Sequence, residues 1–243
     1  MRALSASELL DVWERGLAQQ PVERALELLG AACSEISPDA LAHLSIGRRD
    51  AGLLTLRAWT FGARMAGVIS CARCGERLEL ALDVGAFQTP AGGEVTREIS
   101  LTIDGYDVRF RSPNSVDLAA CAGLDSSKIP AELLQRCVIE AVAENKSLTA
   151  DQLPEHCAQA ITDRMAEADP QADIQIDISC PACNHRWRQT FDIVSFFWSE
   201  IDAWARRVLR EVHVLALAYG WSESEILHLS PRRRQFYLEM AGA

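Results

Sequence analysis

The chain has 243 residues, of which 49% are hydrophobic and 24% are charged. This composition is typical of a globular protein with a substantial core, and it excludes the disordered and fibrous classes. Asp and Glu outnumber Lys and Arg by 34 to 24, which gives a net charge of −10. Because this charge would repel a phosphate backbone, no nucleic-acid partner is expected.

No segment of the sequence has the character of a signal peptide or of a membrane span. Glu8, Asp11 and Glu14 interrupt the opening stretch, and no later run of about 18 residues is apolar and free of charge. We therefore expect a cytoplasmic protein without a membrane partner. In that compartment, cysteines are thiols or metal ligands more often than parts of a disulfide framework.

Helical periodicity governs the first part of the chain. Ser5 and Glu8 form a capping box, in which the hydroxyl accepts from the amide three residues on and the carboxylate accepts from the Ser5 amide. Three further helices are predicted at residues 22–32, after Ser37-Pro38 and at residues 46–61. The core side of the fourth helix is expected to be Leu53, Leu54, Leu56 and Trp59.

Alternating apolar and polar residues, typical of strands with one buried face, follow at residues 79–83, 98–103 and 106–110. Asp104-Gly105 joins the last two segments, and this dipeptide tolerates the positive φ values of a type I′ turn. We predict a hairpin here, preceded by a loop at residues 90–93.

The rest of the chain is mostly helical in pattern. Predicted helices cover residues 116–122, 131–143 and 149–165, a strand covers 172–178, and a long amphipathic helix covers 196–219. Two more helices begin at the capping box of Ser222 and Glu225 and at Ser230-Pro231.

The strongest chemical signal is a pair of Cys-x-x-Cys motifs, each flanked by predicted strands. The candidate metal ligands are Cys71, Cys74, Cys180 and Cys183. Two thiolates of one tight turn converge on an ion at about 2.3 Å, and two such turns supply four sulfurs. Asp83 follows Cys71 at the same interval as Asp192 follows Cys180, which indicates a repeated unit of strand, turn and strand. We predict one structural Zn²⁺ in a zinc ribbon that is split by 105 residues, because loop-closure cost grows only logarithmically.

Other interpretations of these cysteines stay open at this point. The two pairs are alternatively unrelated reduced thiols, ligands of an iron–sulfur cluster or a redox disulfide. His185, two residues after Cys183, is an alternative ligand that is more typical of a strand residue. The four single cysteines lie on apolar helix faces and are expected to be core residues: Cys33, Cys121, Cys137 and Cys157.

We assign no catalytic residue. The sequence has no G-x-S-x-G, G-x-x-x-x-G-K-[ST], H-E-x-x-H or G-x-G-x-x-G motif. His156 and Cys157 are neighbours that should point about 100° apart on a helix, so we do not expect them to pair. Four thiolates leave a metal ion no open position for catalysis. We therefore expect a non-enzymatic protein.

Aromatic residues are concentrated in the C-terminal tail. Trp221, Phe236 and Tyr237 are our candidates for a partner-binding surface, because such residues anchor interfaces. The alternative is that they fold back onto the turn from Phe196 to Trp204 as a small core. The basic clusters of Arg206, Arg207 and Arg210 and of Arg232 to Arg234 are interpreted as solvated helix faces.

The order of several short motifs resembles a known family. They are Leu44 to Asp50, Leu53-Leu54-Leu56-Arg57, Thr60 to Gly62, the two Cys-x-x-Cys motifs, Phe191 to Ile193, Glu211 to His213, Leu215-Ala216, Tyr219 to Glu223, Glu225 to Leu227, and Arg232 to Arg234 with Tyr237-Leu238. Together they resemble proteins of the phage T4 baseplate and hub-assembly family, in the version found in extracellular contractile injection systems. Ala72 departs from the Pro that many such knuckles carry.

This resemblance implies a non-enzymatic role in building the baseplate of a phage tail-like contractile particle. The implied partners are other baseplate, hub or spike subunits, with assembly in the cytoplasm. The chain then either stays in a released or anchored particle or acts as a transient assembly chaperone. The alternative function is a zinc-ribbon adaptor in transcription or nucleic-acid binding.

The predicted fold class is α+β, with helices surrounding a small antiparallel sheet and the split zinc ribbon. We expect an N-terminal helical region at residues 1–67, the ribbon at 68–195 with inserted elements at about 90–171, and a helical tail at 196–243.

Overall fold

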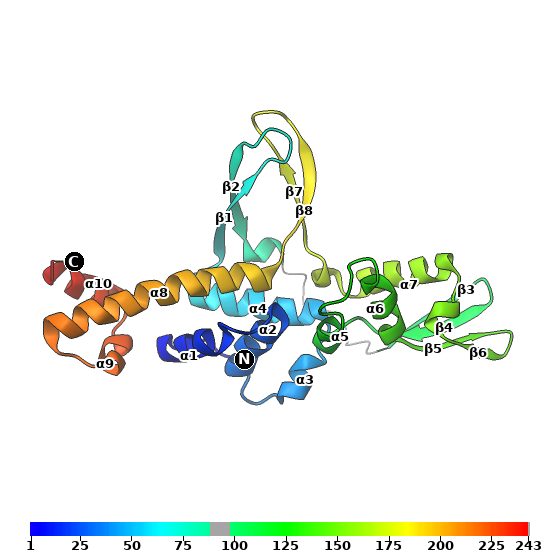
Figure 1. Ribbon diagram of the computed structural model, residues 1–243, viewed down its shortest axis with the longest axis horizontal. Helices are drawn as coiled ribbons and strands as arrows, with labels where there is room; N and C mark the ends of the chain where they lie inside the picture. The colour runs from blue at the N-terminus through cyan, green and yellow to red at the C-terminus, as the bar shows by residue number, and fades with distance from the viewer. Residues whose placement is uncertain (88–97, 243) are drawn as a thin grey trace. The chain divides into compact units, whose positions relative to one another are not determined.

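The computed structural model describes residues 1–87 and 98–242, and it combines helices with small antiparallel sheets, which confirms the α+β class (Figure 1). The chain divides into two compact units. One is formed by Met1–Glu35 and Ile193–Ala243, and the other by Ile36–Asp192. The predicted loop at residues 90–93 lies outside the described residues, and the division at residues 67 and 195 stays a prediction.

The first unit is helical. Its elements are α1 (Ala6–Gly16), α2 (Pro21–Ala32), α8 (Ile193–Tyr219), α9 (Glu223–His228) and α10 (Pro231–Met240). The capping boxes at Ser5 and Ser222 are confirmed, and the Ser230 side chain accepts from the Arg233 amide at the start of α10. These local signals fix where the helices begin.

Trp198 of α8 is the point where three helices of this unit meet. Its ring lies directly against Gly16 at the end of α1, and the guanidinium of Arg24 from α2 stacks over it at 4.5 Å from the ring centroid. Arg24 Nε also donates to the Gly16 carbonyl at 2.9 Å. One turn along α8, Asp202 accepts from Trp13 Nε1 at 2.9 Å. The close approach of α1 and α8 therefore requires a glycine at position 16.

The second unit contains the described strands. Its helices are α3 (Pro38–Ala42), α4 (Ile46–Phe61), α5 (Ser115–Ala120), α6 (Ile129–Cys137) and α7 (Glu155–Ala168). Its strands are β1 (Arg64–Ser70), β2 (Arg77–Asp83), β3 (Ile99–Ile103), β4 (Tyr106–Phe110), β5 (Val138–Ala143), β6 (Lys146–Leu148), β7 (Gln175–Ser179) and β8 (Arg186–Thr190).

Three antiparallel sheets are present among the described residues, rather than the single one expected. The predicted hairpin at Asp104-Gly105 is confirmed, and it forms half of a four-stranded sheet in the order β3-β4-β5-β6. The predicted helix over residues 131–143 is wrong after Cys137, because Val138 to Ala143 pair with β4 as a strand. A run rich in β-branched residues favours that outcome.

Helix α7 covers this sheet, and the two share one apolar core. Phe110 and Val108 from β4 pack with Cys157 and Ile161 from α7, all of them 0–1% exposed. The other three single cysteines are buried as predicted. Trp59 is the exception among the predicted core residues of α4, because its side chain is 49% exposed. Among the helices that the structure describes, none combines the length and apolarity needed to cross a bilayer.

The contact between Gly16 and Trp198 leads to a test of stability. In Gly16→Ala, the new Cβ would lie 2.2 Å from Trp198 Cη2, so we expect the free energy of unfolding to fall by about 1–3 kcal/mol. Gly30→Ala is the matched control, because a Cβ at this α2 position meets nothing within 4 Å. We expect this control to raise stability by about 0.5–1 kcal/mol. Urea unfolding followed by circular dichroism measures both, and equal effects would contradict the packing described here.

Candidate metal centre

The two Cys-x-x-Cys motifs lie in the loops of two equivalent hairpins, β1–β2 and β7–β8, which lie side by side (Figure 1). The strand residues next to the loops pair in the same way. Ser70 lies opposite Arg77 in the first hairpin, and Ser179 lies opposite Arg186 in the second.

Each loop is closed by the same two backbone hydrogen bonds. The Cys71 amide donates to the Glu76 carbonyl and the Gly75 amide to the Cys71 carbonyl, both at 2.8 Å. In the second loop, the Cys180 and Asn184 amides make the corresponding bonds at 2.9 Å. Gly75 and Asn184, each directly after the second cysteine of its loop, have φ values of +76° and +56°, which is the left-handed conformation. This geometry turns both thiols of a loop to one side.

The four sulfurs converge, as the matched spacing predicts. Cys71 Sγ lies 3.7 Å from Cys183 Sγ, Cys74 Sγ lies 3.6 Å from Cys180 Sγ, and all four atoms lie within 4.8 Å of one another. Tetrahedral ligands held about 2.3 Å from one ion are about 3.8 Å apart. The donor set and its spacing therefore fit a four-coordinate metal ion.

The thiols differ in their ionisation. Burial opposes loss of the Cys71 proton, but the backbone amides of Cys74 and Arg73 and the neighbouring thiols outweigh it and lower the pKa of Cys71 to about 7. At Cys74 the backbone amide of Glu76 favours the thiolate, while the nearby sulfurs of Cys183 and Cys180 and burial outweigh it and raise the pKa to about 12. When four sulfurs lie this close together, one of them ionises readily, but repulsion between thiolates disfavours ionisation of a second. A bound cation relieves this repulsion.

Apolar side chains join the two hairpins below the sulfurs. Leu78 of β2 and Ile178 of β7 are buried, and Trp187 and Ile69 pack against them. The imidazole of His185 stacks on Trp187 with 5.4 Å between the ring centroids. The group of potential ligands found among the described residues is the four cysteines, without His185.

The bases of the hairpins are joined as well. Phe87, just after the first hairpin, stacks on Phe191, just after the second, with 5.2 Å between the ring centroids. Gln171 Nε2 donates to the Phe87 carbonyl at 2.9 Å. Asp83 accepts from the Gly85 amide at 2.8 Å and so caps the turn that follows β2.

The sequence contains a longer repeat than the shared interval from Cys71 to Asp83 and from Cys180 to Asp192. Each residue of the run Ile69-Ser70-Cys71 recurs 109 positions later, at Ile178-Ser179-Cys180, and Arg77 recurs as Arg186. This register includes the strand residues that pair across each hairpin. Comparison of the two halves residue by residue would therefore have predicted the strand boundaries around both loops.

The motif from Leu44 to Asp50 contacts the segment that leads into the second hairpin. The Gly47 amide donates to Asp169 Oδ2 at 2.9 Å, and a Cβ on Gly47 would lie 2.2 Å from Asp169 Oδ1. Arg49 Nε donates to Asp50 Oδ1 at 2.7 Å, and both side chains are buried. Burial raises the pKa of Asp50, and the Arg49 contact opposes that shift.

Arg57 connects the end of α4 to the start of β1. Its Nη1 donates to the Gly62 carbonyl at 2.6 Å and to the Arg64 carbonyl at 2.8 Å, and its side chain is buried. The motif residues are therefore structural supports for the hairpins.

His156 and Cys157 contact each other, although helix neighbours were expected to point about 100° apart. His156 Nε2 lies 3.3 Å from Cys157 Sγ and 3.2 Å from Asp104 Oδ2. A catalytic relay would use the two ring nitrogens for the two partners. Here both partners share Nε2, and Cys157 is fully buried, so these groups do not form a nucleophile and base pair.

The predicted partner-binding residues lie in the helical unit. Trp221 and Tyr237 contact each other at a centroid distance of 4.9 Å, and Phe236 is 62% exposed. The basic clusters are partly paired: Arg206 contacts Asp202, and Arg207 and Arg234 both contact Glu211.

Comparison with known protein families identifies the chain. The family described as T4 bacteriophage base plate protein matches residues 8–198, which is well over half of the chain, so this protein belongs to that family. No curated protein and no solved structure gives a significant match. The matched segment includes both cysteine loops and the motif around Gly47.

The sulfur cluster predicts metal binding that depends on all four cysteines. Protein purified without chelator is expected to carry one metal ion per chain, and Cys180→Ser is expected to lose it together with much of its thermal stability. Cys33→Ser is the matched control, because this thiol is buried outside the cluster. Elemental analysis measures the metal, and wild-type protein without any would contradict the assignment.

Proposed function

We propose that this member of the baseplate family is a non-enzymatic structural or assembly component of a phage tail-like contractile injection system. The observation that carries the proposal is the family match over residues 8–198. Its partners are then other baseplate, hub or spike subunits, which it meets during assembly in the cytoplasm.

We further propose that the four cysteines hold one structural Zn²⁺ as a split zinc ribbon. Thiolate ligands at these separations suit Zn²⁺, and four of them fill its tetrahedral coordination. Such an ion supplies folding free energy, on the order of 10 kcal/mol in small sites. The hairpins need such support, since isolated two-stranded hairpins are marginally stable in water.

The described surface has two open hollows whose lining includes Arg232, Arg233 and Tyr237. Baseplates are built by subunit contacts, and an exposed apolar surface is a common mark of such contacts. The experiment that tests this proposal therefore measures particle assembly.

We expect deletion of the gene in its native host to abolish assembled contractile particles, as seen by electron microscopy of purified fractions. Wild-type protein and Cys33→Ser should restore the particles, and Cys180→Ser should not. Mass spectrometry of purified particles then separates a resident subunit from a transient chaperone. Normal particles in the deletion strain, or recovery of the protein with polymerase or DNA, would overturn the proposal in favour of a nucleic-acid adaptor.

A further inference from the structure

The C-terminal arm, defined here as Tyr219 to Met240, lies outside the segment that matches the family. It contains the end of α8, all of α9 and α10, and large exposed apolar side chains. Phe236 is 62% exposed and Met240 is 57% exposed. The family match over residues 8–198 therefore does not reach this surface.

An aromatic cluster makes the arm a defined platform. Trp221 stacks on Tyr219 with 4.6 Å between the ring centroids, and Tyr237 meets both rings edge-on at 5.7 Å and 4.9 Å. The Tyr219 hydroxyl donates to the Tyr237 carbonyl at 3.1 Å. These contacts orient α10 against the end of α8. These contacts explain how Trp221 and Tyr237 pack, without the alternative in which the tail folds back onto the turn from Phe196 to Trp204.

The three arginines at the start of α10 have different surroundings. Arg234 is buried, and it donates to Glu211 Oε2 at 3.1 Å and to the Leu229 carbonyl at 2.8 Å. Glu211 also contacts Arg207. Arg232 and Arg233 are exposed, and neither forms an ion pair with any residue that the structure describes.

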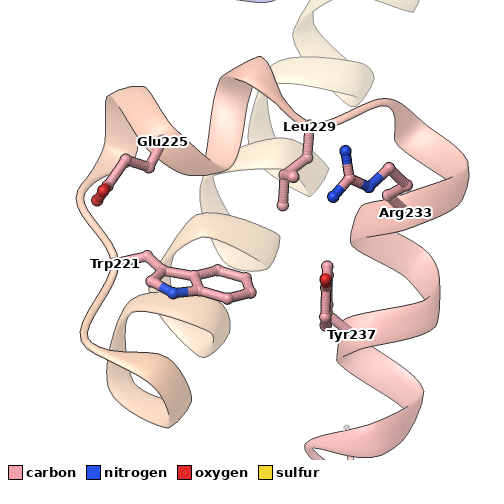
Figure 2. Close-up of a pocket in the computed structure, with 5 residues that line it drawn as sticks. All are labelled: Trp221, Glu225, Leu229, Arg233 and Tyr237. Atoms are coloured by element: carbon pink, nitrogen blue, oxygen red, sulfur yellow. The ribbon is translucent and has the colours of Figure 1, made fainter.

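These two arginines border two adjoining hollows. The first, of about 260 Å³, is lined by Arg232, Arg233, Phe236 and Tyr237. The second, of about 160 Å³, shares Arg233 and Tyr237 and continues to Trp221 and Leu229. Figure 2 shows Arg233 beside Leu229 and Tyr237, with Glu225 on the opposite side, on α9. Glu225 accepts from the Ser222 amide at 2.8 Å, so its carboxylate already caps α9.

The position of the two charges is locally unfavourable. The first turn of a helix carries partial positive charge from its free amides, so cations there reduce helix stability. Arg232 and Arg233 follow Pro231 in this first turn, beside the buried cation Arg234. The chain as a whole has excess negative charge, with a net value of −10. The site thus concentrates unpaired positive charge next to exposed aromatic surface. An anionic ligand would offset both the unfavourable interaction of these cations with the helix start and the repulsion between neighbouring arginines.

We propose that this surface, lined by Arg232, Arg233, Phe236, Tyr237 and Trp221, docks an acidic segment of another baseplate protein that carries an apolar side chain between its carboxylates. The identity of the partner as a baseplate protein rests on the function proposed above. The carboxylates accept charge-assisted hydrogen bonds from Arg232 and Arg233, and the apolar side chain covers Phe236 and enters the hollow beside Tyr237.

Photo-cross-linking identifies the occupant. Phe236 is replaced by p-benzoylphenylalanine in the full-length chain, particles are assembled in the native host under ultraviolet light, and cross-linked peptides are sequenced by mass spectrometry. We expect cross-links to a segment of a different particle protein that is rich in Asp or Glu and contains an apolar residue. Cross-links to a second copy of this chain, to nucleic acid or to a basic segment, or none at all, would overturn the proposal.

A synthetic peptide of the cross-linked segment then tests the role of charge. Binding should weaken as salt rises, and the double variant Arg232→Glu with Arg233→Glu should raise Kd at least about tenfold, because repulsion replaces charge-assisted hydrogen bonds. Arg210→Glu makes the same type of charge change on α8 outside the hollows, and its Kd should stay within about twofold of wild type.

The same double variant separates a binding role from a folding role. Acidic residues are favoured in the first turn of a helix, so the variant should melt no lower than wild type while it binds less tightly. A lower melting temperature with unchanged Kd would overturn the proposal. If the peptide binds as expected but particles still assemble after deletion of the gene, only the proposed baseplate function is refuted.

Discussion

The convergence of four sulfurs is the constraint on which the pairing of the two hairpins depends. Each hairpin alone has two strands and few buried side chains, and such a hairpin is marginally stable in water. Leu78 and Ile178 bury only a small apolar patch between the hairpins. The sulfur atoms meet at 3.6 and 3.7 Å at one end of this patch, and Phe87 stacks on Phe191 at the other. The two hairpins are therefore held together at both ends, with few buried side chains between these ends.

The long segment between the loops does not weaken this arrangement, because it has structure of its own. The sheet β3-β4-β5-β6 and helix α7 share a core around Phe110 and Ile161 that does not include the hairpins. Asp169, just after α7, then accepts from the Gly47 amide. That contact brings the chain back to α4 before β7 begins. Folding of the insertion thus shortens the effective loop that the cysteines must close.

Local chemistry made much of this structure predictable, and what was missed involves one turn without a glycine and contacts distant in sequence. Ser5, Ser222 and Asp104-Gly105 act through neighbours within three residues, so their roles could be inferred directly. The turn after β5 uses Glu144 and Asn145 at positive φ without a glycine. Because no glycine marked this turn, the residues of β5 were predicted as part of a helix. The exposure of Trp59 and the contact of His156 with Asp104 depend on tertiary packing. The four sulfurs were predictable because the loops repeat one local geometry, whereas the metal itself leaves no mark in the sequence beyond its ligands.

Two places in the chain break a local rule, and the difference between them is informative. Gly47 lies near the start of helix α4, where glycine lowers helix stability, but the close approach of Asp169 accounts for it. Arg232 and Arg233 occupy a helix start where cations are disfavoured, and no described residue offers them an ion pair. Departures from local preference persist where another interaction compensates for them. For Gly47 that interaction lies within the fold. For the two arginines no such interaction is present among the described residues, and an acidic partner would supply it.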